Sequence, residues 1–153
     1  MKAGTKGQFK TRPHHKTFRG ILGSEQGRPP GHRPAPVLVR LDPEPGVTPS
    51  QAPPVRVFVG SEPAQYRAER VLVWSIAKVR DPARAYEIHL MKDLEGFDRS
   101  GWKTGFTNYR YAIPQLAGGT GRAIYNDVDQ IYLGDPAELF DADMGGKGVL
   151  SID

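Results

Sequence analysis

The sequence predicts an α/β fold with a mostly parallel sheet, preceded by a disordered N-terminal tail. Three observations lead to this prediction. Short apolar runs alternate with amphipathic segments, and that order of strands and helices is typical of a parallel α/β sheet. The composition, 38% hydrophobic and 25% charged, is that of ordinary globular proteins. The first 54 of the 153 residues differ sharply from the rest in charge and proline content.

Residues 1–54 are interpreted as a basic, Pro/Gly-rich tail or linker. They hold nine Lys and Arg against three Asp and Glu, together with ten of the 14 prolines. Residues 1–36 contain few large apolar side chains, so little burial would offset the entropy lost on ordering. Residues 37–41 suit a short strand, and the prolines that follow predict an extended linker. We therefore expect the folded part to span residues 55–153.

Two strands and a helix are predicted in the first half of that part. Residues 55–59 form an apolar run that Gly60 ends, as expected for a buried strand. Residues 63–79 place small or apolar side chains at spacings of three and four, which predicts an amphipathic helix. Residues 86–91 alternate in polarity and predict a second strand. His89, within it, is interpreted as a strand residue and not as a metal ligand.

The second half continues the same alternation. Residues 108–116 predict a short helix, and residues 123–125 predict a third strand. Asp135 followed by Pro136 predicts a helix start, with an N-cap carboxylate and a proline at the first helical position. Residues 149–152 predict a fourth strand. Because a parallel strand needs both of its faces covered, we expect the chain to be a piece of a larger domain, truncated at its C-terminus.

Several protein classes are excluded by what the sequence lacks. The chain has no cysteine, so disulfides, thiol catalysis and thiolate metal sites are excluded. No apolar stretch approaches the length of a membrane span. The basic N-terminus is not followed by the apolar segment of a secretory signal. These observations predict a cytoplasmic protein.

The segment Asp127-Val128-Asp129 is the strongest candidate for chemistry. It follows the third predicted strand, and ligands of open α/β sheets bind outside the carboxyl ends of the strands. Two carboxylates one residue apart can bind Mg²⁺ or Mn²⁺, which would bridge them to a diphosphate and offset the charge of a leaving phosphate. The tripeptide alone also suits a solvated turn.

Residues 109–114 (YRYAIP), 122–133 (RAIYNDVDQIYL) and 135–140 (DPAELF) resemble the central block of glycosyltransferases of the A-type fold. The resemblance is greatest to family 8, which includes glycogenin and the bacterial lipopolysaccharide galactosyl- and glucosyltransferases. It covers residues 55–153, the last segment included, and is specific from about residue 106. It implies a Rossmann-like nucleotide-sugar-binding half-domain of a glycosyltransferase.

The resemblance also implies roles for individual residues. Asp127 and Asp129 would hold Mn²⁺ or Mg²⁺ against a nucleoside diphosphate sugar, with a UDP-sugar as the expected donor. Val128 would offer its backbone to the ribose. Arg110 would bind a phosphate or the donor sugar, a role that suits a planar guanidinium, although a surface helix arginine is the alternative.

Four residues near the first predicted strand match the family's nucleobase and ribose site. Gly60, Ser61 and Glu62 occupy its position at the strand end, and Tyr66 would stack on the base. Ser61 and Glu62 depart from the family, which often has small residues and an Asp there, so base specificity is left open. Tyr66 also suits a core aromatic at a helix start.

Part of the family's site is absent from this chain. The family completes its metal site with a His well beyond the Asp-x-Asp, and builds its acceptor pocket from the C-terminal half. We therefore expect weak nucleotide binding and no sugar transfer from these 153 residues alone. The resemblance implies a glycan or lipopolysaccharide-type acceptor, and hence a place at the inner face of the membrane.

Two other functions stay open at this point. Haloacid dehalogenase-like phosphatases also have an Asp-x-Asp after an apolar strand, with the first Asp as nucleophile, but their motif lies near the domain start. Alternatively, the chain is a non-catalytic fragment whose basic tail binds nucleic acid or an anionic surface. The tail lacks interleaved aromatic residues, so we do not expect nucleic acid as a partner.

Overall fold

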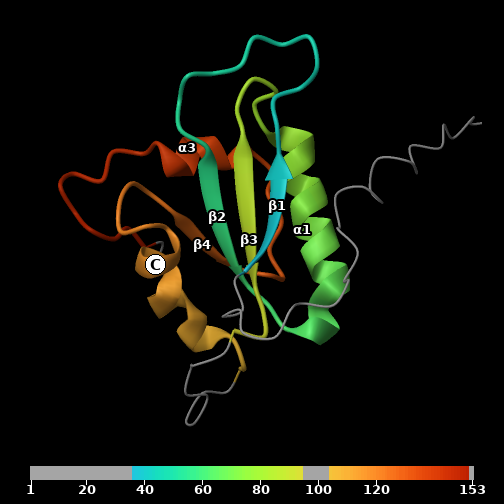
Figure 1. Cartoon of the computed structure of the whole chain (residues 1–153), viewed down its shortest axis with the longest axis vertical. Coiled ribbons are helices and arrows are strands. Elements are labelled where there is room, and N and C mark those ends of the chain that lie inside the picture. Colours follow the sequence, from blue (N-terminus) through green and yellow to red (C-terminus); the bar gives the residue numbers. More distant parts are fainter. Residues whose placement is uncertain (1–35, 95–103, 152–153) are drawn as a thin grey trace, which may run out of the picture.

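The computed structural model describes residues 36–94 and 104–151. Its elements are β1 (Val37–Leu41), β2 (Val55–Gly60), the 3-10 helix η1 (Pro63–Gln65), α1 (Tyr66–Val79), β3 (Tyr86–Met91), the 3-10 helix η2 (Thr107–Ala112), α2 (Ile113–Leu116), β4 (Ile124–Asp127) and α3 (Pro136–Phe140). Four strands form one sheet in the order β1-β3-β2-β4, shown in Figure 1. β2, β3 and β4 are parallel, while β1 is antiparallel to β3. The prediction of a mostly parallel α/β sheet is confirmed.

The main core lies between the sheet and α1, which runs alongside it in Figure 1. Successive strand residues point to opposite faces, so alternate apolar residues of the strands share the face that α1 covers. Its buried side chains include Val57, Val59, Ile88 and Leu90 of the strands and Leu72 and Ile76 of α1. A second cluster lies on the other face, where η2 and the residue before it cover Phe58 of β2.

The three predicted helices are present, with differences in their first turns and helix type. α1 confirms the amphipathic helix predicted for residues 63–79, except that its first turn is the 3-10 helix η1. α3 begins after Asp135, whose side chain accepts a hydrogen bond from the backbone N–H of Ala137 at 2.8 Å, as the predicted N-cap requires. The helix predicted for residues 108–116 is a 3-10 helix that continues into the single α turn of α2.

The folded part begins earlier than the predicted residue 55. β1 pairs with β3, with Val39 opposite Ile88, and the side chain of Val39 is buried in the main core. Residues 42–54 also pack on the domain, because the N–H groups of Glu44 and Ser50 donate to the carbonyls of Pro82 and Ala83, each at 2.8 Å. The prolines restrict the backbone without preventing these contacts, so residues 37–54 are not part of a tail.

The strand predicted at residues 149–152 is also corrected. Residues 149–151 are not in a strand, and the side chain of Val149 is 80% exposed. A parallel strand requires a neighbour with free backbone groups, and the sequence cannot show whether one is there. Ile152 lies outside the described residues, as does the predicted disordered tail apart from residue 36. The inference of a truncated domain stays a prediction.

His89 lies in β3, as predicted. Its ring stacks on Phe58 with 4.3 Å between the centroids, and burial lowers the pKa of the imidazole.

Within residues 36–94 and 104–151, no helix has the length and apolar character needed to cross a membrane.

Candidate functional site

The carboxyl ends of β2, β3 and β4 lie at one edge of the sheet because these strands are parallel. Gly60, the last residue of β2, is in register with Met91 of β3 on one side and with Asp127 of β4 on the other. The structure therefore brings together two residues of the predicted site, Gly60 and Asp127, that are far apart in the sequence.

Asp127 is oriented by a neighbour on its own strand. Tyr125 and Asp127 are two residues apart in β4 and so share one face of the sheet. The Tyr125 hydroxyl donates a hydrogen bond to Oδ1 of Asp127 at 2.9 Å. Burial of the ring, helped by this bond, raises the pKa of Tyr125 to about 12, so the hydroxyl stays a donor at neutral pH. The Asp127 side chain is exposed at this edge of the sheet.

Arg110 lies on the same aromatic ring. Its guanidinium carbon is 5.0 Å from the centroid of Tyr125, within the range of a cation–π contact. Its Nε donates to the carbonyl of Thr107 at 2.8 Å, which anchors the base of the side chain within η2. Arg110 is exposed. Tyr125 therefore contacts both a cation and a carboxylate.

Gly60 is required by packing around Tyr125. A Cβ at this position would lie 2.6 Å from the Tyr125 hydroxyl oxygen and 2.6 Å from Cδ2 of Phe106. Both distances are shorter than real Cβ contacts, so a side chain would displace the phenol or the Phe106 ring. The absence of a side chain at Gly60 therefore lets Tyr125 reach Asp127.

The two carboxylates of the Asp-x-Asp lie on either side of a buried residue. The Val128 side chain is in the main core, whereas Asp127 and Asp129 are exposed, the latter in the turn that follows β4. The described residues contain no group of three or more His, Cys, Asp or Glu side chains that would surround a metal ion. Two carboxylates still fit Mg²⁺ or Mn²⁺ in their chemistry, because Mg²⁺ commonly uses one or two carboxylates with phosphates and water as its other ligands.

The loop after β2 directs its polar side chains inward. The Ser61 hydroxyl is buried and donates to Oε1 of Glu69 at 2.6 Å. Glu62 accepts from the N–H of Gly105 at 2.8 Å through its carboxylate, and its own N–H donates to Oε1 of Gln65 at 2.9 Å. The side chains of Ser61 and Glu62 therefore stabilise the loop.

Tyr66, the fourth residue predicted for the base and ribose, begins α1. Its side chain is exposed, so it is not the core aromatic that the sequence also allowed. Its hydroxyl accepts a hydrogen bond from Nε of Arg67 at 3.1 Å. None of its described contacts involves Gly60, Asp127 or Arg110.

Sequence reasoning missed a buried ion pair beneath this edge. Glu69 of α1 is 3% exposed, and its Oε2 lies 3.1 Å from Nζ of Lys92, the residue after β3. With Ser61, the pair links α1 to the ends of β2 and β3. A signal for it was present, because Glu69 shares the helical stripe of Leu72 and Ile76. A charged residue on an apolar stripe predicts a buried partner.

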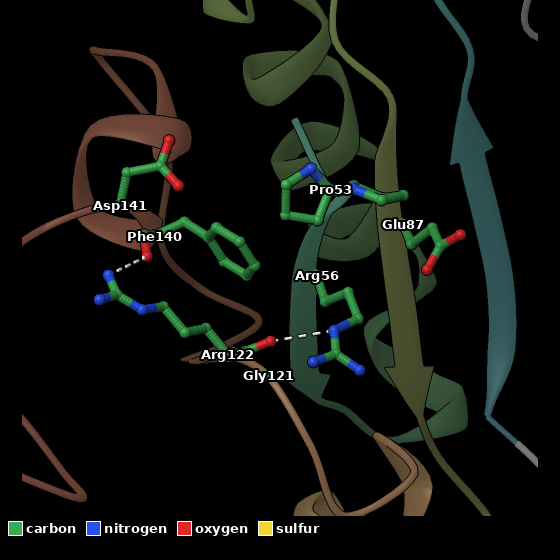
Figure 2. Close-up of a pocket in the computed structure, with 8 residues that line it drawn as sticks. Pro53, Arg56, Glu87, Gly121, Arg122, Phe140 and Asp141 are labelled. Carbon is green, nitrogen blue, oxygen red and sulfur yellow. Dashed lines mark hydrogen bonds between the residues drawn. The ribbon is translucent and has the colours of Figure 1, made fainter. Parts of the chain in front are cut away.

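A separate pocket of about 510 Å³ lies near the amino end of β2, at the opposite edge of the sheet. Figure 2 shows its lining residues, Pro53, Pro54, Arg56, Glu87, Gly121, Arg122, Phe140 and Asp141. Arg56 donates to the carbonyls of Ala117, Thr120 and Arg122 at 2.7 to 2.9 Å. Its guanidinium group thus anchors the turn before β4. None of the residues predicted for the site lines this pocket.

Comparisons with protein-family models, with curated proteins and with solved structures found no match. The family resemblance of residues 55–153 therefore stays a prediction.

Proposed function

We propose that this chain is the nucleotide-sugar-binding part of a metal-dependent glycosyltransferase. The reaction would move a hexose from a nucleoside diphosphate sugar, with a UDP-sugar as the expected donor, to a glycan or lipopolysaccharide-type acceptor. One observation supports it beyond the sequence resemblance. Asp127 lies at the carboxyl edge of three parallel strands, and Tyr125 contacts both its carboxylate and the Arg110 guanidinium.

In this proposal, different residues of the chain bind the metal ion and the phosphate oxygens. Asp127 and Asp129 would hold Mn²⁺ or Mg²⁺, and the bound ion would offset charge on the departing diphosphate. Arg110 would orient phosphate oxygens, since a guanidinium held against the Tyr125 ring is already positioned for the planar, paired hydrogen bonds that phosphate accepts. The exposed position of Arg110 leaves it accessible to a ligand.

The loop that follows β2 would meet the nucleotide through its backbone. The side chains of Ser61 and Glu62 bond to Glu69 and to the N–H of Gly105, so neither would serve the base or ribose without breaking these bonds. Gly60 is buried at the end of β2 and lies in register with Asp127. The backbone of Val128, whose side chain is buried in the core, would contact the ribose from the turn that follows β4.

Paramagnetic broadening by Mn²⁺ tests this proposal even when binding is weak. In ¹H–¹⁵N spectra of the full chain with UDP, Mn²⁺ should broaden the amide signals of Gly60, Asp127 and Asp129 before others. The Asp127→Asn variant should lose this local broadening and the metal-dependent affinity for UDP. Asp143→Asn, an exposed carboxylate outside the site, is the matched control and should retain both. UDP binding that is absent, or identical with EDTA and with Mn²⁺, would refute the proposal.

A further inference from the structure

The outer face of α1 carries exposed side chains of two kinds. It consists of Tyr66, Arg67, Arg70, Val71, Trp74 and Lys78, which we call the α1 outer face. At 3.6 residues per turn, these six positions fall within an arc of about 140°, with Trp74 near its middle. The opposite side of α1 is buried against the sheet through Leu72 and Ile76. The helix therefore has one face in the core and one that faces outward.

Large apolar side chains on this face are not covered by the described chain. Tyr66, Val71 and Trp74 are each about half exposed, at 49%, 52% and 50%. A single exposed apolar residue is normal on a protein surface, but three on one face of one helix form a contiguous patch. Lys78 lies over the Trp74 ring with Nζ 5.6 Å from the centroid, and Arg67 lies over Tyr66 at 5.7 Å. On this face, two basic side chains therefore lie against aromatic rings.

The charge of the α1 outer face has one sign. Its three charged residues are Arg67, Arg70 and Lys78. The one acidic residue of α1, Glu69, is buried on the other side with Lys92 and contributes nothing to this face. A helix face with aromatic rings, an aliphatic residue and cations without acids has the character of a helix that lies in the interface of an anionic membrane.

We propose that the α1 outer face docks on an anionic lipid bilayer. Basic side chains are attracted to acidic lipid headgroups, and Trp and Tyr rings are favoured at the level of those headgroups. Nucleic acid would satisfy the cations but would leave the apolar surface of Val71 and Trp74 without a partner in a phosphate backbone. The lipid surface accounts for both kinds of side chain, and the inference does not depend on the proposed metal or nucleotide site.

Vesicle binding of the full chain tests the charge component. The chain should sediment with phosphatidylcholine vesicles that contain phosphatidylglycerol, and less as salt is raised. Lys78→Glu should weaken this partition about 30-fold, since each basic residue near an anionic surface contributes about 1 kcal/mol and reversal counts twice. Lys147→Glu, an exposed lysine outside the face, should change it much less. Equal losses in the two variants would overturn the proposal.

The aromatic component needs a second pair of variants. Trp74→Ala should weaken the partition, whereas Leu133→Ala, which removes an 86% exposed apolar side chain elsewhere, should not. The chain has two tryptophans, so in a Trp102→Phe background the fluorescence reports Trp74 and should shift to the blue on anionic vesicles. An unchanged emission maximum with bound vesicles would overturn the proposal. So would Lys78→Glu weakening the binding of duplex DNA while leaving vesicle binding intact.

Discussion

The hydroxyl of Tyr125 donates a hydrogen bond to Oδ1 of Asp127 over 2.9 Å at the carboxyl end of β4. The face of the same ring carries the guanidinium of Arg110. Because one partly buried aromatic side chain contacts both groups, the carboxylate and the cation are already positioned before a ligand binds. Such preorganisation reduces the entropy lost on binding.

The Tyr125→Phe variant should distinguish the effect of Tyr125 on the orientation of the Asp127 carboxylate from its effect on the stability of the fold. The substitution keeps the ring beneath Arg110 and removes the bond to Asp127, so we expect a loss of about 0.5–1.5 kcal/mol in the free energy of unfolding. We also expect weaker Mn²⁺ broadening at Asp127, because its carboxylate becomes free to rotate. Urea denaturation and ¹H–¹⁵N spectra measure the two effects.

Tyr132→Phe is the matched control for that variant. Its hydroxyl donates to Oδ1 of Asn126 at 2.6 Å, so a similar amount of stability should be lost. No change in Mn²⁺ broadening is expected, because neither residue is part of the proposed site. If the two variants affect metal binding equally, Tyr125 has no positioning role.

Gly60→Ala should destabilise the fold through overpacking. The new methyl group would lie 2.6 Å from the Tyr125 hydroxyl oxygen and from Cδ2 of Phe106, so the expected cost is about 1–3 kcal/mol. Gly134→Ala is the control, since no atom lies within 4 Å of its Cβ, and its effect should be within about 0.5 kcal/mol. Chemical denaturation of both variants measures the difference. A neutral Gly60→Ala would mean that Tyr125 and Phe106 have room to move.

Glu69→Ala should be among the more damaging single substitutions. It leaves the ammonium group of Lys92 and the hydroxyl of Ser61 without their buried partner, and removing one member of a buried ion pair costs about 3–5 kcal/mol. The double variant Glu69→Leu with Lys92→Met should recover much of that loss, because no charge is then left unpaired. Thermal and urea unfolding of the three proteins test this. A double variant that is no more stable than Glu69→Ala would contradict it.

The Arg84–Asp141 pair predicts a defined pH dependence. Nη1 and Nη2 of Arg84 donate to the Asp141 carboxylate, and these bonds lower the pKa of Asp141. A lowered pKa in the folded state means that the pair stabilises the fold above the carboxyl's ordinary pKa, near 4, and that the stabilisation is lost as the pH falls through the lowered value. Since the Asp141 side chain is 54% exposed, solvent screening limits the contribution to about 1 kcal/mol.

Asp141→Asn should therefore lower the free energy of unfolding by about 1 kcal/mol at pH 7 and by almost nothing near pH 2. Asp143→Asn is the control, because no ion pair is described for its carboxylate. Urea titrations at the two pH values provide the comparison. A difference between wild type and Asp141→Asn that persists in acid would show that the ion pair is not its cause.

Local patterns predicted most elements of the fold, and the failures have a common cause. The stripe of Leu72 and Ile76 predicted α1, and the Asp135-Pro136 start predicted α3, because both depend on residues within a few positions of one another. The strand predicted at residues 37–41 is β1, but local composition placed it outside the folded part, and it predicted a strand at residues 149–151 that is absent there. A strand joins a sheet only where another strand has free backbone groups. The proline content of a segment gives no information on whether a neighbouring strand is available.

In the candidate site, too, some residues could be predicted from local sequence and others could not. Asp127 was proposed because it follows a predicted strand, and Gly60 because of the family resemblance; parallel pairing places the two residues together. The inward direction of Ser61 was not foreseen, since it depends on Glu69, which lies on a different element. The contacts of Tyr125 with both Arg110 and Asp127 were missed for a similar reason, because Arg110 belongs to η2, a different element.

By itself, the sequence determined the alternation of strands and helices and the position of two carboxylates where an apolar run ends. These follow from spacing along the chain and from the chemistry of each side chain. The tertiary structure alone decided which polar groups became partners and which stayed exposed, as for Glu69 with Lys92 and for Asp127 with Tyr125. The physical reason is that burial and hydrogen bonding depend on what lies nearby in space, and packing brings together residues that the chain keeps apart.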